Sequence, residues 1–348
     1  MVKVALAGGA GSCCCLHPVG SKVLTPYVDV GQEVHDALVA RGVHEILVLS
    51  RRDAPAGELS PGVQWAKTTY DDVDQLAETL KGVHTVLSFV TGPTDPTKTE
   101  QKSAQKVLID ASIKAGVKRF APSEWAAAKF DHMFWYDFKD ETRTYLAEVN
   151  REKKVIEYCL FQPGLFTNYL TYPFNSSKHV HLFETPINYH RRRALITEGR
   201  EDAIFTLTTA QDFAKVVALA VEYEGEWPVI GGIKGATMTV GQIIALGEKL
   251  RGETFEVTRL KAEDLKAGVV EAPWLPWVDH PSIPEETIQA FSGAMLSGFL
   301  LGISAGNFEI SDEWNRLLPD FRFTQPEDFL TTAWAAIDDG AKSVHTDY

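Results

Sequence analysis

Three glycines near the start of the chain have the type and spacing that suit the binding of a dinucleotide. Gly8 and Gly11 follow a short apolar run, and joining Ser12 to Val30 brings Gly31 into a Gly-x-x-Gly-x-x-Gly motif between a strand and a helix. Such glycines allow a tight turn and a close approach of the backbone to a pyrophosphate. We expect Gly8, Gly11, Ser12 and Gly31 to bind the cofactor; a purely structural strand-to-helix turn is the alternative.

Residues 13–29 separate the two halves of this motif and differ from both in composition. The segment has neither the periodicity of an element nor the composition of a linker, and it holds three of the four cysteines. We interpret it as a retained intron, because it is a whole number of codons and its removal restores the motif without a gap. The alternative is a surface insertion, since a longer loop adds little closure entropy. If the segment disrupts the phosphate loop, the chain as written binds no dinucleotide.

Two arginines, Arg51 and Arg52, follow the second predicted strand about twenty positions after Gly31. At this place an acidic residue binds the ribose 2′-hydroxyl of NAD, whereas an arginine accepts the 2′-phosphate of NADP. The guanidinium group matches phosphate in a bidentate geometry. The cofactor is therefore expected to be NADPH rather than NAD, although Asp53 leaves NAD open.

The elements that must position these residues alternate along the chain. Predicted strands cover residues 2–7, 45–50, 63–66, 85–89, 119–121 and 156–161, and predicted helices cover residues 31–41, 73–80, 99–115 and 139–150. Single helices between strands require parallel pairing through crossovers, so the fold class is α/β, a doubly wound (Rossmann) mostly parallel sheet. Ligands of such sheets bind beyond the carboxyl ends of the strands. Ser88 and Ser123, at two of these ends, are therefore expected to contact the cofactor.

The predicted domains follow from this order of elements. Residues 1–163 are expected to form the NAD(P)-binding Rossmann domain, and residues 204–235 to return to its sheet. A smaller C-terminal α+β lobe, residues 164–203 and 236–348, is expected to bind the substrate.

The segment Val117-Lys-Arg-Phe-Ala-Pro-Ser-Glu-Trp125 resembles a motif of the NmrA-like and isoflavone-reductase-like families, which are atypical short-chain dehydrogenases/reductases with an NAD(P)-binding Rossmann fold. Matching stretches also begin at Phe161, Thr209 and Glu263. The resemblance covers most of the chain outside residues 13–29.

The resemblance implies a catalytic lysine on the helix after the Pro-Ser-Glu segment. Lys139 matches it through a Lys-x-x-x-Arg pattern that ends at Arg143, and it is expected both to act as the acid/base residue and to contact the cofactor. An ordinary surface lysine is the alternative, because acidic residues follow it directly. Tyr136 precedes Lys139 by three residues, whereas ordinary short-chain dehydrogenases space this pair by four, so a Tyr-Lys proton relay is in doubt.

Aromatic residues crowd the predicted crevice. Trp125, Tyr136, Phe166 and Tyr169 are expected to line the substrate pocket, where a flat ring can stack. Packing between the lobes is the alternative for each of them.

Composition narrows the class of protein further. A formal net charge of −13 over 348 residues argues against a general nucleic-acid or anionic-membrane binder, and no apolar run is long enough to span a membrane. The cysteines show neither zinc spacing nor a disulfide framework, so no metal is expected and a cytoplasmic location is favoured.

Two functions agree with these observations. The first is an NADPH-dependent reductase of a small, aromatic carbonyl, enone or quinone-methide-like compound. The second is a non-catalytic NADP-sensing regulator of the NmrA-like type, which acts through a regulatory protein partner. The fold alone does not separate them.

Overall fold

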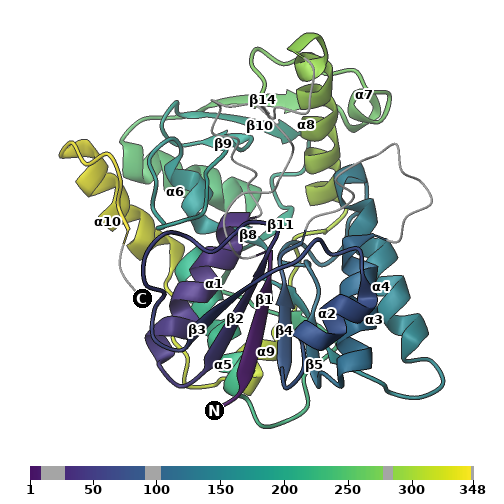
Figure 1. Cartoon of the computed structure of the whole chain (residues 1–348). Helices are drawn as coiled ribbons and strands as arrows, with labels where there is room; N and C mark the ends of the chain where they lie inside the picture. Colours follow the sequence, from purple (N-terminus) through teal and green to yellow (C-terminus); the bar gives the residue numbers. More distant parts are fainter. Residues whose placement is uncertain (9–27, 91–102, 277–284, 346–348) are drawn as a thin grey trace.

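A six-stranded parallel sheet forms the centre of the computed structural model, which describes residues 1–8, 28–90, 103–276 and 285–345 (Figure 1). Register is continuous through the centre, because Val4 pairs with Ile46 on one side and with Thr85 on the other. The prediction of a doubly wound α/β fold is confirmed. The strand order is β3-β2-β1-β4-β5-β6, with β1 Lys3–Ala7, β2 Glu45–Ser50, β3 Val63–Lys67, β4 Thr85–Ser88, β5 Arg119–Ala121 and β6 Glu157–Tyr158.

Successive residues of the central strand β1 face two different cores. Val4 and Leu6 pack into the core beneath α1 and α5, whereas Ala5 and Ala7 pack into the core beneath α2, α3 and α4. Figure 1 shows these two helical layers on opposite faces of the sheet. Burial on both faces explains why the strands read as continuous apolar runs. The helices are α1 Val28–Arg41, α2 Val73–Thr79, α3 Ala104–Ala115, α4 Asp137–Val149 and α5 Ala210–Glu222.

Local signals set the ends of these helices. The Asp72 carboxylate accepts the N–H groups at the start of α2, and the Ser103 hydroxyl does the same for α3. Gly116 ends α3 with φ of 76°, a conformation that glycine adopts without strain. The N-caps Asp72 and Ser103 fix where two strand-to-helix loops end, and such loops form the edge of the sheet that holds the candidate site.

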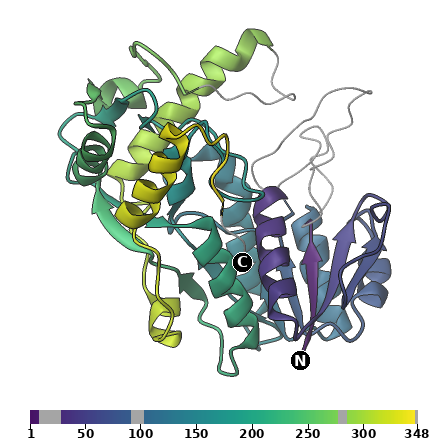
Figure 2. The same ribbon diagram turned by 90° about the vertical axis from the view of Figure 1, so that its left-hand side faces the viewer.

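The second lobe contains two small sheets and the C-terminal helices (Figure 2). Residues 204–235 were predicted to return to the large sheet, and they contain β11 and β12. Strand β12 pairs with β7, which follows β6 in the chain, whereas β11 pairs with β8 and β13. The two small sheets comprise β8 Leu165–Phe166, β9 Ile187–Asn188, β10 Arg193–Thr197, β11 Ile204–Thr208, β13 Ala236–Thr239 and β14 Glu256–Leu260. A separate pair is formed by β7 Leu160–Gln162 and β12 Ile230–Gly232. The helices are α6 Val240–Arg251, α7 Ala262–Lys266, α8 Ile288–Ser304, α9 Glu313–Leu317 and α10 Pro326–Asp338, with short 3-10 turns at Phe134–Tyr136, Thr167–Thr171 and Glu285–Thr287.

Helix α1 fastens the second lobe to the large sheet. Glu33 is fully buried, and its Oε1 atom accepts the backbone N–H groups of His179 (2.7 Å) and Val180 (3.2 Å). Asp36, on the same helix, pairs with Lys178 at 2.6 Å and with His179 at 2.9 Å. The helix that follows the glycine motif is therefore also the helix that holds the neighbouring lobe.

Candidate active site

The glycine motif begins at a sharp turn directly after β1. Gly8 has φ of 79°, and a Cβ atom there would lie 3.0 Å from the backbone carbon of Phe89, so only glycine fits without displacing β4. Gly31 lies buried in the first turn of α1. Gly11, Ser12 and residues 13–27 lie outside the described residues, and their predicted roles stay predictions.

Arg51 and Arg52 leave the carboxyl end of β2, as a 2′-phosphate site requires. The Arg51 guanidinium carbon lies 5.8 Å from the ring centroid of Tyr70, whereas the Arg52 side chain is exposed. Asp53 pairs with Lys67 at 2.9 Å. Since that carboxylate is engaged by a lysine, the arginines rather than Asp53 present their charge at the end of β2.

Ser88 and Trp125 are directed into the protein interior. The Ser88 hydroxyl donates to Gln105 (2.6 Å), and the Ser88 carbonyl accepts the indole N–H of Trp125 (2.8 Å). The Trp125 ring stacks between Phe89 at 4.7 Å and Phe161 at 5.5 Å and is only 5% exposed. This is the environment of a core residue, and the predicted contacts of Ser88 with the cofactor and of Trp125 with the substrate stay predictions.

Lys139, the predicted acid/base residue, is buried beneath the loop that follows β5. Its side chain is 1% exposed, and Nζ donates to the carbonyl oxygens of Ser123 (2.5 Å) and Glu124 (2.7 Å). The interpretation as an ordinary surface lysine therefore does not hold. The acidic neighbours that suggested it point elsewhere, because Asp140 and Glu141 lie on the exposed side of α4.

Burial dominates the electrostatics of this lysine. Removal from water lowers the pKa of Lys139 to about 7; the Glu124 carboxylate opposes this shift and the Arg143 guanidinium adds to it. Glu124 and Arg143 form a largely buried ion pair that includes Nε of Arg143 at 3.0 Å, and Arg143 also stacks on Phe130 at 4.2 Å. At neutral pH, Lys139 can therefore both hold and release a proton.

The predicted cofactor residue Ser123 combines two features of a ligand-binding position. Its carbonyl holds Lys139, while its hydroxyl is buried and finds no hydrogen-bond partner in the described parts of the chain. The amide oxygen of Gln162, whose nitrogen lies 3.5 Å from Glu124, is likewise buried without such a partner. Buried polar groups normally bind protein, ligand or water. Both atoms are thus candidates for contact with a bound molecule.

The three remaining aromatic candidates lie in two places. Tyr136 is half-buried, with the Nζ atom of Lys139 at 5.0 Å from its ring centroid. Phe166 and Tyr169 are buried 6.1 Å apart, and Tyr169 packs against Phe183 at 4.3 Å. Tyr136 thus lies beside the lysine, whereas Trp125, Phe166 and Tyr169 are buried among other side chains, and their roles in a pocket stay predictions.

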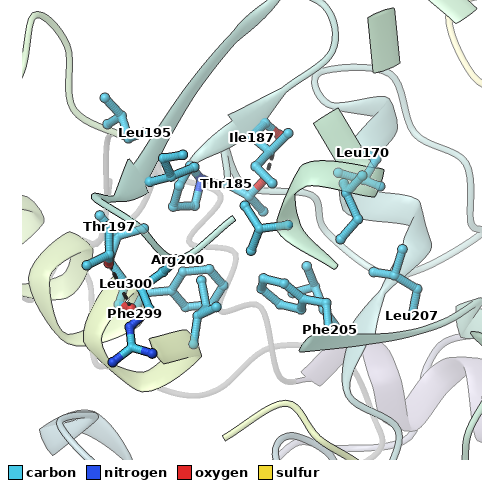
Figure 3. A pocket seen from close by; sticks show the side chains of 16 residues that line it. Leu170, Thr185, Ile187, Leu195, Thr197, Arg200, Phe205, Leu207, Phe299 and Leu300 are labelled. Carbon is cyan, nitrogen blue, oxygen red and sulfur yellow. Dashed lines mark hydrogen bonds between the residues drawn. The ribbon is translucent and has the colours of Figure 1, made fainter. Parts of the chain in front are cut away.

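A small apolar cavity lies in the second lobe (Figure 3). Its walls come from β8, β10, β11, α6 and α8, and they include Arg200 and the neighbouring rings of Phe205 and Phe299, whose centroids are 6.2 Å apart. A volume of about 20 Å³ is little more than a water molecule needs. The cavity is therefore a packing space of the lobe, too small for an aromatic substrate.

Two further classes of site find no support in the structure. No group of three or more His, Cys, Asp or Glu side chains in residues 1–8, 28–90, 103–276 and 285–345 could hold a metal ion. Among the helices of these same residues, none combines the length and apolar character needed to cross a bilayer.

Three residues of the site region, Glu124, Arg143 and Tyr70, were missed from the sequence. Glu124 lies in the Pro-Ser-Glu segment and Arg143 ends the Lys-x-x-x-Arg pattern, but the spacing alone predicted no role for either side chain. Tyr70, whose hydroxyl accepts the N–H of Gly8 at 3.0 Å, gave no signal, because it lies in a loop without periodicity.

Comparison with known proteins agrees with this geometry. A model of the NmrA-like family matches residues 29–295. The oxidoreductase BOA1 of Botryotinia fuckeliana is 25% identical over 334 residues, which is 94% of this chain and all of that protein. The fold is shared with an NADPH-dependent quinone oxidoreductase of Escherichia coli, with a TM-score of 0.63 and 18% identity over 95% of this chain and 99% of that chain. It is also shared with a structure from the pinoresinol-lariciresinol and phenylcoumaran benzylic ether reductases, with a TM-score of 0.64 and 16% identity over 95% of this chain and 98% of that chain.

Proposed function

This chain belongs to the NmrA-like family, and we propose that it is an NADPH-dependent reductase of a small, aromatic carbonyl, enone or quinone-methide-like compound. The observation that carries the proposal is Lys139, a buried lysine with a pKa of about 7 at the carboxyl end of β5. Strongly shifted groups at such sheet ends are candidates for acid/base work. The oxidoreductase names of its relatives point in the same direction.

The described residues suit NADPH. The turn at Gly8 and the buried Gly31 at the start of α1 provide a place for the pyrophosphate, and Arg51 provides a cation for the 2′-phosphate. The Ser123 hydroxyl has no hydrogen-bond partner among the described residues, and the carbonyl of the same residue binds Lys139. This hydroxyl would offer a hydrogen bond to the nicotinamide end. When bound, the cofactor supplies a hydride.

Lys139 would supply the proton that the reduction also needs. Addition of hydride to a carbonyl carbon, or to the β-carbon of an enone, leaves negative charge on the substrate oxygen. The Lys139 ammonium would stabilise that charge and then transfer a proton from Nζ to the oxygen, after which the neutral amine regains a proton from solvent. A pKa near the working pH serves both steps. The carbonyl groups of Ser123 and Glu124 keep the ammonium in place meanwhile.

Aromatic side chains beside Lys139 support a flat substrate. Tyr136 lies directly beneath Nζ, and its neighbours Trp135 and Phe134 extend a row of rings outward, 5.7 Å and 5.3 Å apart, to a Phe134 side chain that is 48% exposed. Rings at such distances provide offset or edge-on contacts for a further ring. An isolated aliphatic ketone would use little of this surface.

One observation favours the second candidate, a dinucleotide-sensing regulator. Nζ of Lys139 is buried against two backbone carbonyl groups, an arrangement that also suits a purely structural tie between the β5 loop and α4. The missing four-residue spacing between Tyr136 and Lys139 removes the usual partner of a catalytic lysine. Under this alternative NADPH binds but is not oxidised.

The two functions are separated by kinetics. The purified chain is mixed with NADPH and a panel of aromatic enones, carbonyl compounds and quinones, and absorbance of the reduced nicotinamide is followed. We expect turnover that falls by about 10²- to 10⁴-fold in Lys139→Met when NADPH is saturating. Equal rates in both proteins would remove Lys139 from the mechanism. Tight NADPH binding without turnover of any compound would establish the sensor instead.

A further inference from the structure

Tyr70 occupies an unusual backbone position between β3 and α2. Its φ of 63° lies in the left-handed region, which bulky residues rarely adopt, and its side chain is 4% exposed. Such a conformation persists where the surrounding contacts determine it, and it is found most often at functional sites. The contacts of the side chain show what the position achieves.

The Tyr70 hydroxyl lies at the junction of β1 and β2, where the glycine motif begins. It donates to the carbonyl oxygen of Leu49 at 2.7 Å and accepts the backbone N–H of Gly8 at 3.0 Å. The same N–H also reaches the Leu49 oxygen at 3.2 Å. Burial raises the pKa of Tyr70, so the hydroxyl keeps the proton that it donates. Tyr70 thus joins the Leu49 carbonyl in holding the backbone N–H of Gly8.

The ring of the same side chain supports Arg51. The guanidinium carbon lies 5.8 Å from the ring centroid, within the range of a cation–π contact. Among the described residues no carboxylate pairs with Arg51, and the nearby Asp53 is engaged by Lys67 at 2.9 Å. The ring therefore orients a cation whose charge is not neutralised by an acidic side chain of the described chain.

We propose that Tyr70 is a positioning residue that joins the glycine turn to Arg51 and thereby sets the preference for a dinucleotide with a 2′-phosphate. The inference rests on the proposed NADPH function. The hydroxyl acts on the turn, which every dinucleotide would share, whereas the ring acts on Arg51, which only a 2′-phosphate would contact. Removing the hydroxyl and removing the ring must therefore have different effects on NADPH and NADH.

The test measures binding of NADPH and NADH to the full chain by nicotinamide fluorescence. Tyr70→Phe keeps the ring and is expected to weaken both dinucleotides equally, by about fivefold. Tyr70→Leu removes the ring as well, and the ratio of NADPH to NADH affinity is expected to fall by about twofold to fivefold further. In an Arg51→Ala background, Tyr70→Leu should leave that ratio unchanged, because the cation that the ring orients is gone.

Tyr189→Phe is the matched control. Its hydroxyl is equally buried and donates to the Ile243 carbonyl in the second lobe, so its loss should leave both affinities unchanged. Thermal unfolding shows whether each variant is folded. If Tyr70→Leu does not fold, Tyr70→Phe, which preserves the volume of the side chain, still tests the role of the hydroxyl. An unchanged affinity ratio in Tyr70→Leu, or unchanged affinities in Tyr70→Phe, would overturn the inference alone. If the original chain binds neither dinucleotide, the proposed cofactor function is overturned, and the inference with it.

Discussion

The buried ammonium group of Lys139 makes the free energy of unfolding depend on pH, and this dependence tests its lowered pKa without any substrate. Burial lowers the pKa of Lys139 in the folded chain to about 7, whereas a lysine in an unfolded chain titrates near about 10.4. Between these two values the unfolded chain holds a proton that the folded chain lacks. The free energy of unfolding therefore rises with pH across this window, and it is lowest below pH 7.

The size of the effect follows from the shift. A full difference of one proton changes the free energy of unfolding by about 1.4 kcal/mol per pH unit. The perturbation is Lys139→Met, which removes the titrating group and leaves the carbonyl oxygens of Ser123 and Glu124 without their donor. That loss costs about 1–3 kcal/mol per carbonyl at every pH. The lost hydrogen bonds shift the free energy of unfolding by a constant, whereas the titration of Lys139 gives it a slope with pH. We expect the difference in free energy of unfolding between the original chain and Lys139→Met to change by about 2–3 kcal/mol from pH 7.5 to pH 9.5.

The assay is urea-induced unfolding, followed by fluorescence of the eight tryptophans, at intervals between pH 6.5 and pH 9.5. Lys215→Met, at an exposed position of α5, is the control and should run parallel to the original chain. A difference curve for Lys139→Met that stays flat across the window would refute the lowered pKa. It would also remove the reason for assigning proton transfer to this lysine.

Three further outcomes are expected. Deletion of residues 13–29 should tighten NADPH binding at least about tenfold in fluorescence titration, because it restores the glycine spacing; equal affinity would show that the segment is a harmless insertion. Glu124→Gln should move the midpoint of the pH–rate profile for Lys139 below 7, since the carboxylate opposes the shift; a midpoint moved upward would contradict this. Trp125→Ala should lower the free energy of unfolding in urea by about 3–5 kcal/mol, as a core residue does, whereas a loss below about 1 kcal/mol would place the ring in an open pocket.

The large sheet could be predicted from the sequence because its strands are buried on both faces. The expected strands at residues 45–50 and 119–121 have the observed bounds, and those at residues 2–7, 63–66 and 85–89 differ by one residue at an end. The strand expected at residues 156–161 is divided into β6 and β7. The shortest strands of the second lobe were not predicted. β8 and β9 have two residues each, and two residues carry no periodicity. Their pairing depends on partners distant in sequence, which a local pattern does not contain.

The sequence proposed residues for the candidate site but did not reveal their surroundings. The resemblance identified Lys139, yet its burial depends on the loop at Ser123 and Glu124 closing over it. Trp125 shows the opposite case, because an aromatic residue inside a site motif turned out to pack in the core. Its backbone adopts φ of 33°, and the direction of a side chain in such a loop follows from dihedral angles that residue types do not reveal.

The charge balance around Lys139 bears on its proposed role as a proton donor. Glu124 and Arg143 act on its pKa in opposite directions, so burial, rather than either neighbour, accounts for the value near 7. A group whose pKa is lowered by burial responds strongly to a new charge, because little water is present to screen it. Negative charge that develops on a substrate oxygen would therefore favour the ammonium form at the moment when a proton is needed. A lysine held at pKa 7 by a permanent cation would lack this property, since that cation would stabilise the oxygen in its place.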